Sequence, residues 1–112
     1  MPGHAGEGML RITVVDDGAE QKWILQGRLT KDSVHELLSI WQTSGNHRCE
    51  RTVIVDLNDV VAIDQSGERV LAMMIEQEAR LLTSGLYTRH LVEDLKVRIG
   101  RGEFAAYKQK IH

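Results

Sequence analysis

The sequence predicts an α/β fold in which helices pack on a mixed β-sheet of about four strands, in the order β-β-α-β-α-β-α. Alternating apolar residues near the N-terminus indicate a hairpin, and the β-branched run at 53–55 indicates an interior strand. Segments with helical periodicity lie between and after these strands. Because a strand–helix–strand unit joins parallel neighbours, at least one strand pair is expected to be parallel.

The hairpin is predicted from strands at 10–14 and 22–26. The first strand alternates apolar and polar residues, which is typical of a strand with one buried face. The turn Asp16-Asp17-Gly18 suits an antiparallel return because glycine adopts positive φ freely, and Gly27 is expected to end the second strand.

A first helix is predicted from Thr30 onward, with an apolar face formed by Val34, Leu37, Leu38 and Trp41. Either Thr30 or Asp32 is expected to cap its start, and Ser44-Gly45-Asn46 to stop it. Trp41 and the strand residue Trp23 are both expected to lie in the core.

The second half of the chain is predicted to contain two further helices. The interior strand at 51–57 is expected to be covered on both faces and to end at the turn Asn58-Asp59. A helix follows from about Ser66 to about Glu78, and residues 79–82 either extend it or form a short strand. The last helix has a predicted apolar face of Tyr87, Leu91, Leu95 and Ile99, and Gly100-Arg101-Gly102 ends it.

The 112 residues suffice for one domain with its own core. We expect a flexible N-terminal arm at 1–9, a folded domain at 10–99 and a basic C-terminal tail at 100–112. The net charge of −2 argues against a dedicated nucleic-acid binder. The chain has no apolar run of about 20 residues and no signal-peptide pattern, which predicts a cytoplasmic protein without membrane insertion.

Catalytic and metal-binding motifs are absent from the sequence. The five histidines show no ligand spacing, the single Cys49 cannot form an intramolecular disulfide, and no glycine-rich phosphate loop follows a strand. We therefore expect no enzyme activity, no metal and no cofactor. Asp56, Asp59 and Asp64 surround one loop, where they either hold a cation or cap and turn the chain.

Gly67 stands in the first turn of the second predicted helix, where it weakens the helix by about 0.5–1 kcal/mol relative to alanine. Two interpretations remain open at this point. The glycine is either simply tolerated beside a helix cap at Asp64 or Ser66, or it permits close approach of another group.

Several segments together resemble the STAS domain, the module shared by sulfate transporters and anti-sigma factor antagonists. The resemblance covers about residues 10–97. The matching segments are Leu25-Gln26-Gly27-Arg28-Leu29, Val53-Ile54-Val55-Asp56-Leu57, Asn58-Asp59-Val60 and Ile63-Asp64-Gln65-Ser66-Gly67. The resemblance implies that residues 79–83 form a short strand.

The resemblance also identifies a switch loop. In anti-sigma factor antagonists this loop reads Asp-Ser-Ser-Gly, and a partner kinase phosphorylates the first serine. Here Asp64, Gln65, Ser66 and Gly67 occupy the four positions. Glutamine cannot accept phosphate, so the usual switch is expected to be absent, with Ser66 as an alternative phosphorylation site in a shifted register.

The function implied by the resemblance is that of a non-enzymatic, bacterial protein-interaction module in transcription regulation and signalling. The expected partner is a kinase-like ATPase that acts as an anti-sigma factor. The predicted partner-binding residues are Thr30, Asp32, Asp64, Gln65, Ser66, Gly67 and Arg69. The alternative is a cytoplasmic accessory subunit of a lipid ABC-type transporter, with the basic segment at 96–110 near anionic lipid. The sequence leaves the oligomeric state open.

Overall fold

The computed structural model describes residues 10–43 and 51–104. Within them the elements follow the predicted order. They are β1 (Leu10–Asp16), β2 (Glu20–Leu29), α1 (Val34–Thr43), β3 (Thr52–Ile63), α3 (Gln65–Glu76), β4 (Arg80–Leu82) and α4 (Leu86–Gly100). The short strand β4 confirms what the resemblance implied for residues 79–83.

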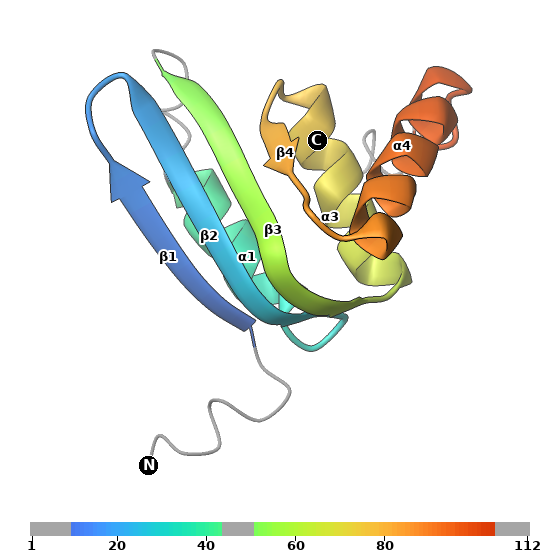
Figure 1. The fold of residues 1–112 in the computed structure, drawn as a ribbon, viewed down its shortest axis with the longest axis horizontal. Helices are drawn as coiled ribbons and strands as arrows, with labels where there is room; N and C mark the ends of the chain where they lie inside the picture. Colours follow the sequence, from blue (N-terminus) through green and yellow to red (C-terminus); the bar gives the residue numbers. More distant parts are fainter. Residues whose placement is uncertain (1–9, 44–50, 105–112) are drawn as a thin grey trace.

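The four strands form one mixed sheet in the order β1-β2-β3-β4 (Figure 1). β1 and β2 are antiparallel and turn at Gly18, whose φ is +94°. β2 with β3 and β3 with β4 are parallel, because α1 and α3 each carry the chain back along the sheet. The predicted mixed α/β fold is therefore confirmed.

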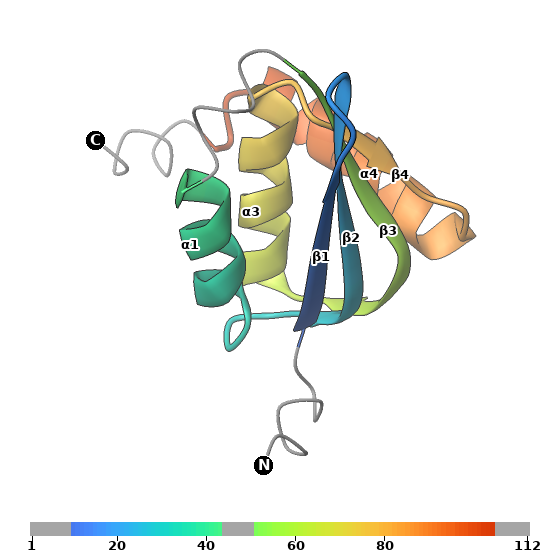
Figure 2. The ribbon, with the colours of Figure 1, turned by 90° about the vertical axis from the view of Figure 1, so that its left-hand side faces the viewer.

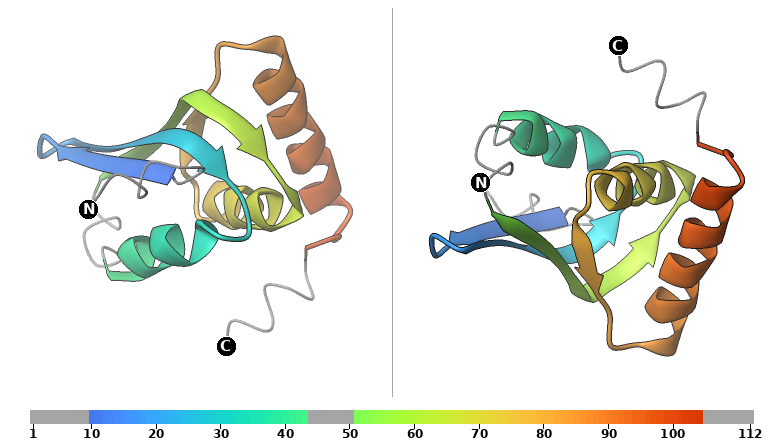
Figure 3. Two further views of the ribbon diagram at one scale, coloured as in Figure 1. Left: turned by 90° about the horizontal axis from the view of Figure 1, so that it is seen from below. Right: turned by 90° about the horizontal axis from the view of Figure 1, so that it is seen from above.

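Helices α1 and α3 form a layer on one face of the sheet (Figure 2). Figure 2 shows α1 and α3 side by side on that face. Seen from below and from above, α4 lies beside α3 at the β4 side of the molecule (Figure 3). No helix within residues 10–43 and 51–104 is both long and apolar enough to cross a membrane.

The core lies between the sheet and this helical layer. Its largest fully buried side chains come from β2, α1, β3, α3 and α4: Trp23, Leu25, Leu29, Leu37, Trp41, Leu57, Leu71, Met74 and Leu95. The rings of Trp23 and Trp41 are 4.9 Å apart between centroids. Their indole N–H groups donate to Gln21 Oε1 at 2.8 Å and to Gln77 Oε1 at 3.0 Å. The predicted burial of both tryptophans is confirmed.

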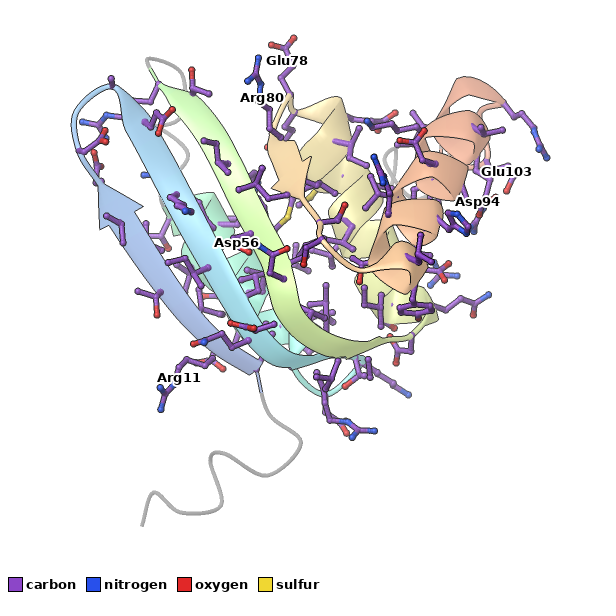
Figure 4. All side chains as sticks on the ribbon, in the orientation of Figure 1. Arg11, Asp56, Glu78, Arg80, Asp94 and Glu103 are labelled. Atoms are coloured by element: carbon purple, nitrogen blue, oxygen red, sulfur yellow. The ribbon has the colours of Figure 1, made fainter. Side chains whose placement is uncertain are left out.

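The opposite face of the sheet is partly open, which corrects the prediction of an interior strand covered on both faces. Val53, Val55 and Leu57 point into the core, whereas Ile54 and Asp56 alternate with them and are half-buried. Figure 4 shows Asp56 on the face of β3 that lies away from α1 and α3. Because the helices cover one face alone, burial alternates along β3.

Both predicted strand ends in this region were wrong. Gly27 does not end β2; it adopts φ +110° within a shift of register, and the strand continues to Leu29. The pair Asn58-Asp59 does not turn the chain either, since β3 runs on to Ile63. Asp59 Oδ2 instead accepts a hydrogen bond from Gln26 Nε2 at 3.3 Å, and Val60 is buried. Pairing with β2 therefore extends both strands past local turn signals.

The helix ends and faces also differ from the predictions in detail. α1 begins at Val34 and α3 ends at Glu76, with Glu78 following at φ +72°. On α4, Tyr87 is 61% exposed rather than part of the apolar face, whereas the predicted Leu91, Leu95 and Ile99 pack against the core together with Val92. Phe104 turns back into the core after α4. The predicted arm at 1–9, the stop signal at 44–46, Cys49 and residues 105–112 lie outside the described residues.

Candidate functional site

The candidate site is built around Asp64, which joins the loop after β2 to the start of α3, directly after the end of β3. Asp64 is the N-cap of α3, and its Oδ1 accepts a hydrogen bond from the Gly67 amide at 2.9 Å. Its Oδ2 accepts from the Lys31 amide at 2.9 Å, and its own amide donates to the Leu29 carbonyl at 3.3 Å. One carboxylate therefore holds the β2–α1 loop against the start of α3.

The ionised form of Asp64 is favoured by this arrangement. Partial burial raises the pKa of the carboxyl, but hydrogen bonds from the backbone amides of Gly67, Lys31 and Ser66 outweigh it and lower the pKa below its ordinary value. At neutral pH the side chain is thus a charged acceptor for both loops, and its charge complements the positive end of the helix dipole.

Gly67 lies where the first turn of α3 comes closest to the end of β2. A Cβ at this position would lie 2.3 Å from the Leu29 carbonyl oxygen and 3.0 Å from side-chain atoms of Leu29 and Ile63. Of the two interpretations left open by the sequence, close approach is the one observed, and the approaching group is the end of β2 itself. Gly67 is buried, so its role is to let α3 pack against β2 rather than to contact a partner directly.

The β2–α1 loop is organised by Ser33, which the sequence analysis missed. Its hydroxyl donates to the Arg28 carbonyl at 2.7 Å and accepts from the Thr30 amide at 3.0 Å. The Thr30 carbonyl in turn accepts the amides of Ser33 and Val34. The Ser33 side chain therefore fixes the turn that leads into α1. The side chains of Thr30 and Asp32 do not have this role. A serine directly before the first apolar position of a helix is the signal that could have identified it.

Exposure divides the predicted partner-binding residues into two groups. Asp32, Gln65 and Arg69 are exposed, and Lys31 beside them is exposed as well. Thr30, Asp64 and Ser66 are half-buried and Gly67 is buried. We use the name docking surface for the exposed set Lys31, Asp32, Gln65 and Arg69. Asp64 and Gly67 hold the elements that carry it.

The three aspartates near this loop each have a partner within the protein. Asp56 lies 4.0 Å from Lys22 Nζ, Asp59 accepts from Gln26, and Asp64 caps α3. Among the residues that the structure describes, no three His, Cys, Asp or Glu side chains come together in a way that could hold a metal ion. The capping interpretation is therefore the one observed for Asp64.

Ion pairs neutralise part of the predicted basic segment. Arg98 donates to Glu68, Asp94 and Glu103 at 3.2, 3.1 and 3.1 Å. Figure 4 shows Asp94 and Glu103 close together beside α4. The hydrogen bonds that Arg98 donates to Asp94 and Glu103 raise its pKa, so the guanidinium stays charged and paired. Arg98 thus ties α4 to the start of α3 and is not available for anionic lipid.

Comparisons with known proteins identify the fold. No family model and no curated protein matches the chain. A solved structure with a TM-score of 0.50 and 9% sequence identity covers 70% of this chain and 70% of its own. It is an uncharacterised protein of the DUF3478 family from Shewanella loihica PV-4, described as having a SpoIIAA-like fold. The resemblance to STAS domains and anti-sigma factor antagonists is thereby confirmed for the fold.

Proposed function

We propose that this protein is a non-enzymatic regulatory interaction module that binds a protein partner through the docking surface. The observation that carries the proposal is the bidentate role of Asp64, which fixes the β2–α1 loop to α3. Exposed side chains from the β2–α1 loop and from the start of α3 are thereby held as one preorganised surface. Preorganisation lowers the entropic cost of binding, and the SpoIIAA-like fold supports the same conclusion.

The partner that we propose is a kinase-like ATPase of the anti-sigma factor type. Gln65 is exposed at the first position of α3, the place of the phosphorylated serine in the family that the sequence resembles. Because an amide side chain cannot be phosphorylated, binding at this surface would not be released by the usual switch.

Ser66 provides the alternative regulation. A serine that caps a helix has its hydroxyl engaged, but Asp64 supplies the cap of α3, so the Ser66 hydroxyl is not needed for capping. Ser66 is half-buried, however, and a phosphate there would stand beside the Asp64 carboxylate. We therefore propose that Gln65 keeps the surface in a constitutively binding form.

Site-directed photo-cross-linking in the native cells tests this function. A photoreactive amino acid replaces Gln65, and a matched control carries it at Glu93, which is exposed on α4. We expect position 65, but not position 93, to cross-link to a kinase-like ATPase, and we expect Arg69→Glu to abolish the product. Mass spectrometry of the captured protein also reports whether Ser66 carries phosphate.

Two outcomes would contradict the proposal. Equal cross-linking from positions 65 and 93 would show that the docking surface is not where the partner binds. A product with a transporter permease or its ATPase would favour the accessory-subunit alternative. The ion pairs of Arg98 speak against that alternative, because they neutralise part of the basic segment on which it rests.

A further inference from the structure

The outer edge of β1 is a second surface with recognisable binding chemistry. β1 pairs with β2 along one side, and its other side pairs with no strand among the residues that the structure describes (Figure 1). In an edge strand, alternate backbone N–H and C=O groups point away from the sheet. These groups are free to add a further strand.

β1 lacks the features that usually protect such an edge. Its seven pairs with β2 run from Leu10 to Asp16 without a shift of register, so no bulge twists the edge away. It contains no proline, and its centre is the uncharged β-branched run at 13–15. Val14 is 38% exposed and Val15 is 48% exposed, so apolar side chains are open on both faces. A regular edge whose centre is apolar and uncharged favours strand addition.

The charge pattern of β1 favours a second copy of the same strand. Arg11 stands at the beginning, where Figure 4 shows it at the free lower end of the strand. Asp16 and Asp17 stand at the other end, and Arg51 neutralises the Asp16 carboxylate. Asp17 accepts hydrogen bonds from the amides of Ala19 and Glu20, and no ion pair joins it to another of the described residues. Antiparallel pairing of two copies would bring each Arg11 toward the acidic end of the other strand, whereas parallel pairing would align like charges.

We propose that two copies of this protein associate through antiparallel pairing of their β1 strands, joining two four-stranded sheets into one continuous sheet. A two-fold axis makes the strand complementary to itself, so each favourable contact occurs twice. The docking surface lies on the β2–α1 loop and the first turns of α3, and not on the outer edge of β1 that this arrangement pairs. The pair would therefore present two docking surfaces, a property independent of which partner binds them.

Sedimentation equilibrium of the full chain tests the association. Full overlap of two seven-residue strands places the two-fold axis at Thr13, the middle residue of β1. Thr13→Lys would set two ammonium groups against each other across the axis, and we expect the dissociation constant of the dimer to rise about tenfold or more. Arg11→Glu is expected to weaken the dimer as well, because it would oppose the acidic strand end.

Thr52→Lys is the matched control. Thr52 is also an exposed threonine, but it lies in β3, inside the sheet. We expect this variant to dimerise like the wild type. Circular dichroism verifies that each variant is folded, and Val15→Lys replaces Thr13→Lys if the latter fails to fold.

A wild-type protein that stays monomeric up to millimolar concentration would overturn the proposal. So would a dimer that Thr13→Lys and Thr52→Lys affect equally, or one that Arg11→Glu strengthens. Because these measurements use the isolated chain, they are unaffected by the identity of any partner at the docking surface.

Discussion

Replacing Gly67 with alanine tests the close contact between α3 and the end of β2. The added Cβ would stand 2.3 Å from the Leu29 carbonyl oxygen, about 0.7 Å short of the 3.0 Å below which real Cβ contacts essentially do not occur. The obstructing atom is backbone, and the same carbonyl accepts the Asp64 amide. To avoid this contact, α3 must move away from β2. That movement would strain the hydrogen bonds that join α3 to the β2–α1 loop.

Two opposing effects set the magnitude. Alanine in place of glycine favours a helix interior by about 1 kcal/mol. Overpacking of a well-packed region costs about 1–3 kcal/mol, and a backbone obstacle places this case in the upper part of that range. We therefore expect Gly67→Ala to lower the free energy of unfolding by about 1–2 kcal/mol, and the melting temperature by roughly 5–10 °C.

Urea denaturation followed by circular dichroism measures the effect. Gly100→Ala is the matched control, because Gly100 ends α4 and a Cβ there meets no atom within 4 Å. The control variant is expected to be slightly more stable than the wild type, by about 0.5 kcal/mol. If Gly67→Ala is as stable as Gly100→Ala, the close approach of α3 and β2 is not a constraint, and the reasoning is refuted.

Three further substitutions test other features of the structure. Asp64→Asn keeps an acceptor for the Gly67 amide but not a charged acceptor for the Lys31 amide, and we expect a loss of about 1 kcal/mol in urea denaturation at pH 7. Because the folded-state pKa of Asp64 is lowered, its carboxylate stabilises the protein above about pH 4. The difference in free energy of unfolding between wild type and Asp64→Asn should vanish as the pH falls through that folded-state pKa. A difference that is the same at all pH values would contradict this expectation. Glu78 has a φ of +72°, which glycine adopts without strain. Glu78→Gly should therefore raise the melting temperature, by an amount that corresponds to about 0.5–1 kcal/mol in free energy of unfolding. An unchanged melting temperature would mean that Glu78 is not strained. Arg98→Met removes three ion pairs and the contact with the Phe104 ring. We expect the free energy of unfolding to fall by about 0.5–1 kcal/mol, and by less in high salt. A decrease independent of salt would mean that packing, and not charge, is responsible.

Most of the fold could be predicted from hydrophobic periodicity, because this periodicity reflects which side chains reach the core. The positions of Trp23 and Trp41 followed from a strand pattern and a helix pattern, and both residues are buried. Tyr87 shows where this reasoning ends. It shares a helical spacing with Leu95, but α4 turns the face containing Thr88 and Val92 toward the core. The rotation of a helix depends on the neighbour against which it packs, which its own sequence does not contain.

Long-range contacts explain the remaining differences. Gly27 and Asn58-Asp59 have local turn chemistry, yet the parallel ladder between β2 and β3 holds both segments extended. At the candidate site the sequence left the cap open between Asp64 and Ser66, and it left the meaning of Gly67 open. The partners of Asp64 and Gly67 are in the β2–α1 region, about 35 residues earlier in the chain, and only the fold brings them together.

Trp23 and Trp41 are the only two tryptophans of the chain, and their position gives the protein a built-in optical probe. Each indole comes from a different layer, one from β2 and the other from α1, and their ring centroids are 4.9 Å apart. At this separation the two chromophores are electronically coupled, so near-ultraviolet circular dichroism and tryptophan fluorescence should change when α1 leaves the sheet. Trp41 also donates to Gln77 at the end of α3. Refolding followed by fluorescence would therefore record the moment at which both helices dock, without any label.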